Sequence, residues 1–197
     1  MTTQSKVQLW NRALQKVGAR RIATEDEDSK EVETCSACYD SLRRDELRGN
    51  AWKFAIKRVQ LAASGNAPAW GRERFFALPG DYLKDVPQDP KFMETPADWL
   101  FETDSNGVTG IATDDAAPLD FRYVYDCTEV GRFDPLFFEA LAARMAAEIV
   151  YDLKQSTGGK QDLLTEYEVL MGRARRLNAI EIGPSEPDED TWITERL

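Results

Sequence analysis

The chain has 197 residues, of which 42% are hydrophobic and 10% aromatic, so it carries enough apolar side chain for a core and global disorder is not expected. The formal net charge of -10 argues against a freestanding nucleic-acid binder, because such proteins need basic patches that displace counterions. No apolar run reaches the ~20 residues of a membrane-spanning helix, and no secretory signal is expected in the first residues. Three cysteines, an odd number, argue against a disulfide framework and favour a reducing compartment.

Two helices are expected first. The first should cover residues 5–17 and stop at Gly18, because its apolar positions have the 3-4-3 spacing of one helix face. These positions are Val7, Trp10, Leu14 and Val17. After an acidic connection, Asp28 or Ser29 can cap a second helix that ends near Gly49. Its apolar positions follow the same spacing and are Val32, Cys35, Tyr39 and Leu42.

A strand is expected next. Trp52, Phe54 and Ile56 alternate with other residues, which is the period of a half-buried strand. Val59 and Leu61 continue the alternation with a one-residue shift of phase. That shift predicts a bulge or a strong twist.

Short strands and loops are expected in the middle of the chain. Prolines and glycines dominate residues 64–96. Asn106-Gly107 then lies between two β-prone runs, residues 99–103 and 108–113. Asn-Gly between such runs predicts a hairpin.

Residues 118–150 predict a strand, a turn and a buried helix. The strand alternates through Leu119, Phe121, Tyr123, Tyr125 and Cys127. Gly131 ends it, and Asp134 can cap a helix that begins with Pro135. The helix carries an apolar stripe flanked by four alanines, so a partner helix can approach closely. The stripe is Phe137, Leu141, Met145, Ile149 and Leu153, and the alanines are Ala142, Ala143, Ala146 and Ala147.

A fourth helix is expected over residues 161–179, antiparallel to the third because the turn at 156–159 is short. Its 4-3-4-3 seam predicts packing along another helix. The seam is Leu163, Tyr167, Leu170, Ala174 and Leu177. The tail from Gly183 is acidic and proline-bearing, yet it ends with apolar side chains.

Catalytic, metal and cofactor chemistry is not expected. The chain has no histidine, which removes Ser-His and Cys-His nucleophile pairs and the commonest nitrogen ligand of zinc. Cys35 and Cys38 form a Cys-x-x-Cys without a second pair, so they are interpreted as buried small side chains. The acidic runs are interpreted as solvated loops, and no glycine-rich phosphate loop or calcium loop is present.

Two arginine clusters allow two interpretations. They are Arg43, Arg44 and Arg48 on the second helix, and Arg173, Arg175 and Arg176 on the fourth. They could bridge subunits or contact DNA phosphates, or they could be an ordinary solvated helix face. The sequence leaves both interpretations open.

Several segments together carry a family resemblance. In chain order they read LWNRALQKVGARRI, RGNAWKFAIKRVQLA, FFALPGDYLKDV, PLDFRYVYD, FDPLFFEALAARMAAEIVYDL and YEVLMGRARRLNA. From about Val7 to Ala179 this order resembles the tail tubular protein A family of short-tailed phages. The resemblance implies a structural virion protein of the tail or neck, assembled in the host cytoplasm. It would be a head-to-tail adaptor that forms a dodecameric ring below the portal and provides a channel for genome ejection.

The resemblance also implies partners. They are further copies of the chain, the portal protein, a downstream tail or nozzle protein, and DNA that passes through the lumen without specific binding; no membrane is involved. Two alternatives stay open: a tail enzyme acting on polysaccharide or peptidoglycan, and a soluble helical interaction module with no virion role.

The expected fold class is α+β, mainly helical. A helical bundle with two long antiparallel C-terminal helices and flanking strands would comprise residues 1–62 and 119–182, and an inserted antiparallel β-module would comprise 63–118. Residues 183–197 would form an extended tail. A tail with apolar side chains but no element to pack on predicts a partner-binding site. Its residues would be Trp192, Ile193, Arg196 and Leu197.

Overall fold

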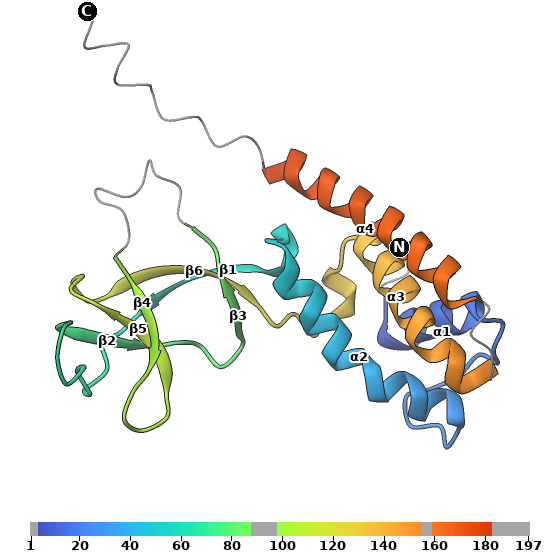
Figure 1. Cartoon of the computed structure of the whole chain (residues 1–197), viewed down its shortest axis with the longest axis horizontal. Helices are drawn as coiled ribbons and strands as arrows, with labels where there is room; N and C mark the ends of the chain where they lie inside the picture. Colours follow the sequence, from blue (N-terminus) through green and yellow to red (C-terminus); the bar gives the residue numbers. More distant parts are fainter. Residues whose placement is uncertain (1–3, 88–97, 155–158, 183–197) are drawn as a thin grey trace, which may run out of the picture.

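The computed structural model describes residues 4–87, 98–154 and 159–182. Within them the chain is α+β, with four α-helices and two antiparallel sheets of three strands each. The helices are α1 (Lys6–Lys16), α2 (Lys30–Gly49), α3 (Pro135–Lys154) and α4 (Lys160–Ile182). The strands are β1 (Ile56–Leu61), β2 (Arg74–Ala77), β3 (Tyr82–Asp85), β4 (Leu100–Thr103), β5 (Thr109–Thr113) and β6 (Leu119–Tyr125). The helices gather at one end of the molecule and the sheets at the other (Figure 1).

Helices α2 and α3 begin at caps that the sequence predicts, and α1 begins at a cap that it does not, since Ser5 was expected inside the helix. Ser5 accepts a hydrogen bond from the backbone of Gln8, whose side chain accepts one in return from Ser5, so α1 starts with a capping box. Of the two predicted caps of α2, Ser29 is the one that accepts the helical N–H. Asp134 accepts from the backbone of Leu136 and caps α3.

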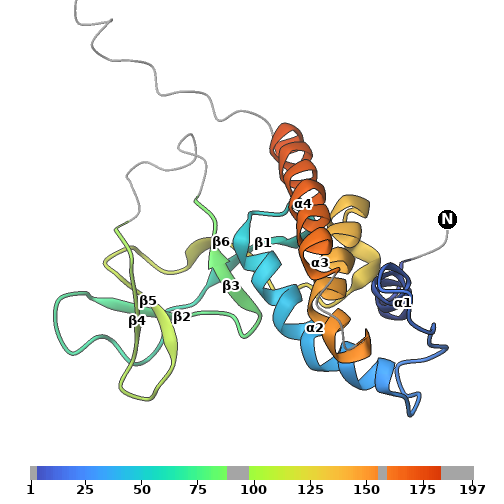
Figure 2. The ribbon, with the colours of Figure 1, turned by 45° about the vertical axis from the view of Figure 1, so that its right-hand side comes forward.

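Helix α3 is the central helix of the helical end. It contacts α1, α2 and α4, and Figure 2 shows these helices around it. Of the predicted stripe, Phe137, Leu141, Met145 and Ile149 are buried at 0–1% exposure, while Leu153 at its end is half-buried. The four flanking alanines are also fully buried, which allows close approach of the neighbouring helices.

Helix α4 lies alongside α3 with Leu163, Tyr167, Leu170 and Ala174 of the predicted seam buried or half-buried, but the seam fails at its C-terminal end. Leu177 was expected in the seam, yet it is 49% exposed. The buried positions are Leu163, Met171, Ala174 and Asn178. The polar Asn178 is buried because its amide donates to the carbonyl of Ala51 (2.9 Å) and accepts from the N–H of Lys53 (3.0 Å). These two bonds fix the rotation of α4 about its own axis. They cannot be predicted from the spacing of hydrophobic residues.

A polar cluster joins three helices at Glu46 of α2, which is only 3% exposed. The hydroxyl of Tyr167 on α4 donates to its carboxylate at 2.6 Å, and Arg144 on α3 donates to the same oxygen at 3.1 Å. Burial raises the pKa of Glu46, while Tyr167 and Arg144 act in the opposite direction. Burial, and then the bond to Glu46, raises the pKa of Tyr167 to about 12.

Tyr167→Phe should lower the free energy of unfolding by about 1.5–3 kcal/mol, because it removes a hydrogen bond to a buried charged group. Urea denaturation at a fixed protein concentration would measure the loss. Tyr151→Phe is the matched control, since Tyr151 on α3 is 54% exposed, and it should change little. Equal stability of the two variants would contradict a stabilising role for the Tyr167 hydroxyl.

The first sheet has the order β1-β6-β3. The predicted strand from Trp52 is wrong over its first part, because Lys53–Ala55 form a 3-10 helix and the strand begins at Ile56. The predicted bulge is also absent from the pairing of β1 with β6, which runs without a shift of register. A register shift occurs instead where β3 pairs with β6, between Tyr82 and Lys84.

The second sheet has the order β2-β5-β4 and forms the far end of the molecule (Figure 1). The predicted hairpin is confirmed, since β4 pairs antiparallel with β5 across residues 104–108. Gly107 takes a positive φ of 81°, as this turn requires. The segment 63–118 contributes strands to both sheets, because β3 pairs with β6.

Gly110 in β5 lies directly against Phe75 and the backbone carbonyl of Phe76, so a Cβ atom there would overlap both. Gly110→Ala should therefore cost about 1–3 kcal/mol of stability through overpacking. Gly80→Ala is the control, since nothing lies within 4 Å of its added Cβ. Thermal melting of the two variants would compare them, and equal melting temperatures would contradict the tight packing.

The helical end and the first sheet are joined by an ion pair between a buried arginine and a half-buried aspartate. Arg43 of α2 donates to the carboxylate of Asp126, just beyond β6, at 2.7 Å and 3.2 Å. The Arg43 side chain is 5% exposed. Burial alone would lower its pKa, but the bond and the attraction to Asp126 outweigh that effect and raise it.

Among the described residues, none of the helices has the length and apolar composition that a membrane-spanning helix needs.

Candidate interaction surfaces

The two cysteines of the Cys-x-x-Cys motif pack within the protein. Cys35 is fully buried and Cys38 half-buried. Burial is the main cause that raises the pKa of Cys35 to about 12 and that of Cys38 to about 11, so both thiols stay protonated at neutral pH. Within residues 4–87, 98–154 and 159–182, no cluster of three or more cysteine, aspartate or glutamate side chains is placed to hold a metal ion.

In the two acidic runs that the structure describes, 25–28 and 114–115, three of the carboxylates accept hydrogen bonds from neighbouring donors. Asp114 accepts from the backbone of Glu73 and from Arg72, and these bonds lower its pKa. Asp115 accepts from the indole of Trp99 at 2.7 Å. Near the N-terminal end, the backbone of Ala23 is the main group that lowers the pKa of Glu27.

Some arginines of the two predicted clusters are bonded within the molecule, and others are exposed. Arg43 is buried in its pair with Asp126, and Arg48 donates to the backbone carbonyl of Leu83. On α4, Arg175 lies 4.0 Å from Glu46. Arg173 and Arg176 are exposed, and no ion pair to either is found within the described part of the chain. Arg44 lies 3.6 Å from Asp126 with a side chain that is 59% exposed. Within the described residues, Arg173 and Arg176 are therefore the two cluster members without a hydrogen bond or ion pair. 

The predicted partner-binding residues Trp192, Ile193, Arg196 and Leu197 lie outside the described residues. The described residues present two other surfaces. The first is a pocket on the second sheet, and the second is the side of α4 that faces away from α3.

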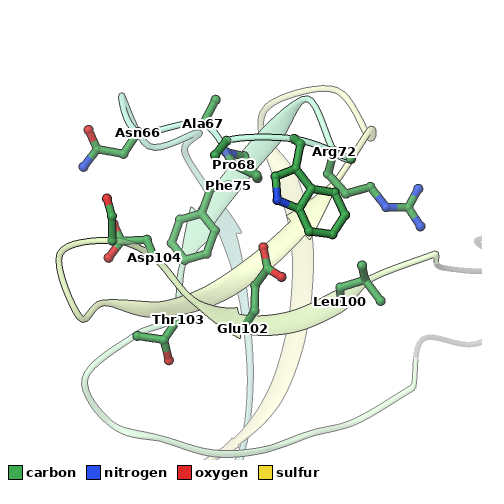
Figure 3. A pocket seen from close by; sticks show the side chains of 13 residues that line it. Asn66, Ala67, Pro68, Arg72, Phe75, Leu100, Glu102, Thr103 and Asp104 are labelled. Atoms are coloured by element: carbon green, nitrogen blue, oxygen red, sulfur yellow. The ribbon is translucent and has the colours of Figure 1, made fainter.

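The pocket has a volume of about 550 Å³ and lies between the β1–β2 loop and β4. Its lining is Asn66, Ala67, Pro68, Ala69, Trp70, Gly71, Arg72, Phe75, Leu100, Glu102, Thr103, Asp104 and Ser105. Figure 3 shows Glu102 pointing into the pocket on the side where Phe75 lies, while Thr103 points to the opposite side. We call this site the aromatic pocket.

The aromatic pocket has an excess of negative charge. Its cation, Arg72, is already neutralised by Asp98 at 2.6 Å and Asp114 at 2.9 Å. Glu102 is exposed, and the described residues supply it with no ion pair. Asp104 accepts two backbone N–H groups of the turn through one carboxylate oxygen, Oδ1. Trp70 adds a large apolar surface that is 87% exposed.

The outer face of α4 combines apolar and basic side chains. Val169, Arg173, Arg176 and Ile180 follow the spacing i, i+4, i+7, i+11, which places them on one side of a helix. Val169 is 50% and Ile180 67% exposed. This face lies opposite the buried side of α4, and within the described residues nothing covers it.

Sequence reasoning missed Trp70 and Glu102. A signal for Trp70 was present, because a tryptophan between Pro68 and Gly71 has no periodic element to pack on. Glu102 carried no comparable signal, since a single glutamate in a strand is usually a solvated side chain.

Comparison with known protein families finds no match for this chain, and comparison with curated proteins finds none either.

Proposed function

We propose that the chain is a structural virion protein, an adaptor of the head-to-tail connector that forms a ring below the portal. The observation that carries the proposal is exposed apolar surface at both ends of one molecule. It comprises Trp70, Leu100, Phe101 and Val108 at the second sheet, and Val169, Leu177 and Ile180 on α4. Of these, Trp70 and Leu100 line one pocket, and Val169 and Ile180 share one side of α4. A ring subunit covers two such different surfaces with its neighbours.

The parts of the chain suit this role. The four helices would form a bundle, with α3 and α4 as its long antiparallel pair, and would build the body of the ring from residues 1–62 and 119–182. The β-module, 63–118, would contact the neighbouring copy at one surface and meet the next tail or nozzle component at another. The tail, 183–197, would bind a neighbouring subunit or the portal.

The charge of the chain also supports a channel. Twelve copies at -10 each give a ring with a charge of about -120. An acidic lumen repels DNA phosphates, so the genome could pass without adhering. Such a protein would contact DNA without binding it specifically.

Electron microscopy of the purified protein, alone and mixed with its portal, tests the proposal. We expect rings in at least the mixture, with the adaptor stacked on the portal. If the protein stays monomeric alone and does not bind the portal, the proposal is overturned and a non-virion interaction module is favoured.

The enzymatic alternative needs two carboxyl groups that are held in a cleft and have different pKa values. In the aromatic pocket, Asp104 is engaged by the turn through Oδ1. No observation in the described residues favours this alternative. Peptidoglycan hydrolysis that one carboxylate substitution abolishes would establish it instead.

A further inference from the structure

The aromatic pocket has the chemistry of a site for a cation. Glu102 points its carboxylate into a pocket that Phe75 and Trp70 also line (Figure 3), and the faces of aromatic rings also attract positive charge. Arg72 cannot satisfy Glu102, because two other carboxylates already bind it. A guanidinium suits such a site better than an ammonium, since it is planar and can stack on an aromatic ring while pairing with a carboxylate.

The outer face of α4 presents two guanidinium groups next to apolar side chains, which complements the carboxylates and apolar side chains of the aromatic pocket. Arg173 and Arg176 are one helical turn apart and lie between Val169 and Ile180. Two positive charges flanked by apolar side chains complement two carboxylates, Glu102 and Asp104, flanked by Trp70 and Leu100. The pocket volume of about 550 Å³ is large enough for more than one side chain.

The two surfaces cannot meet within one molecule. Figure 1 shows the second sheet at one end and α4 along the opposite side. A contact between them must therefore join different copies, and it joins unlike surfaces. Repeated contacts of this kind run head to tail and close into a ring when the rotation between copies allows it.

We infer that the aromatic pocket of one copy receives the outer face of α4 of the next copy, with Arg173 and Arg176 opposite Glu102 and Asp104. This inference rests on the proposed function, since it names the contact by which the ring closes. The bound guanidinium groups would neutralise the pocket, and the exposed indole of Trp70 would be covered.

Charge reversal in the full-length protein tests the contact. Glu102→Arg and Arg173→Glu should each raise the concentration for half-maximal assembly by about tenfold or more, since each places like charges together. Sedimentation velocity over a concentration series at physiological salt measures this, with portal added if the protein alone stays monomeric. The double variant carrying both changes should assemble within about threefold of wild type, because opposite charges again face each other.

Two control variants carry the same changes elsewhere. Arg58→Glu on β1 and Glu33→Arg on α2 alter exposed residues outside both surfaces, and they should assemble like wild type. Far-UV circular dichroism and melting temperatures should match in all variants, because Glu102 and Arg173 are exposed. Trp70→Ala should weaken assembly without changing the fold, since its side chain is 87% exposed.

The outcomes separate the inference from the proposed function. If wild type forms rings and Glu102→Arg forms them equally well, the contact is wrong and the adaptor role stands. If Arg173→Glu weakens assembly but Glu102→Arg does not, the outer face of α4 binds something other than the pocket, and the inference also fails. If wild type never assembles, with or without portal, both fail.

Discussion

Leu141→Ala should lower the free energy of unfolding by about 2–5 kcal/mol, the range for a buried leucine that leaves a cavity behind. Leu141 has 0% exposure and lies on α3, which contacts the other three helices. The surrounding side chains are held from several directions, so they have little freedom to collapse into the space. Urea denaturation followed by circular dichroism, at one fixed protein concentration, would measure the change.

Leu177→Ala is the matched control for this experiment. The two residues have the same side chain, and the hydrophobic pattern places both at the contact between the last two helices. Leu177 is 49% exposed, so its truncation should cost well under about 1 kcal/mol. If the two variants lost similar stability, the rotation of α4 described above would be wrong.

Asp126→Ala should cost about 3–5 kcal/mol, the range for removing one partner of a buried ion pair. The substitution leaves the Arg43 charge in place with a side chain that is only 5% exposed. Asp40 remains beside Arg43, but its own side chain is 73% exposed and its attraction is screened by water. We therefore expect a loss at the lower end of the range, measured by the same denaturation.

Two further variants separate charge from packing at this position. Asp40→Ala should cost no more than about 1 kcal/mol, as expected for a surface pair. Adding Arg43→Met to Asp126→Ala should recover much of the loss, because no buried charge then lacks a partner. An Asp126→Ala protein as stable as wild type would mean that Asp40 and solvent satisfy Arg43 on their own.

The helices could be predicted from the sequence because their signals are local. The hydroxyls of Ser5 and Ser29 and the carboxylate of Asp134 bond to backbone groups within three residues. The buried stripe of α3 follows the helical period, so its core positions could also be named in advance. The Asn-Gly hairpin rests on an equally local preference.

The remaining features depend on distant partners. Trp52 looked like a strand residue, but its indole donates to the carbonyl of Glu46 at 2.9 Å and a 3-10 turn follows it. The rotation of α4 depends on bonds between Asn178 and a backbone segment more than one hundred positions earlier. Of the candidate surfaces, the aromatic pocket depends on how the β1–β2 loop folds against β4, which no local pattern specifies.

The bonds of Asn178 also connect α4 to the first sheet. Its amide holds the backbone at Ala51 and Lys53, the chain then leads directly into β1, and β1 pairs along its whole length with β6. Lys53 adds an ion pair to Glu181, one turn further along α4. A partner that twisted α4 about its axis would therefore pull on the edge of the first sheet. The helical end and the first sheet are thus coupled through α4 as well as through the pair of Arg43 and Asp126.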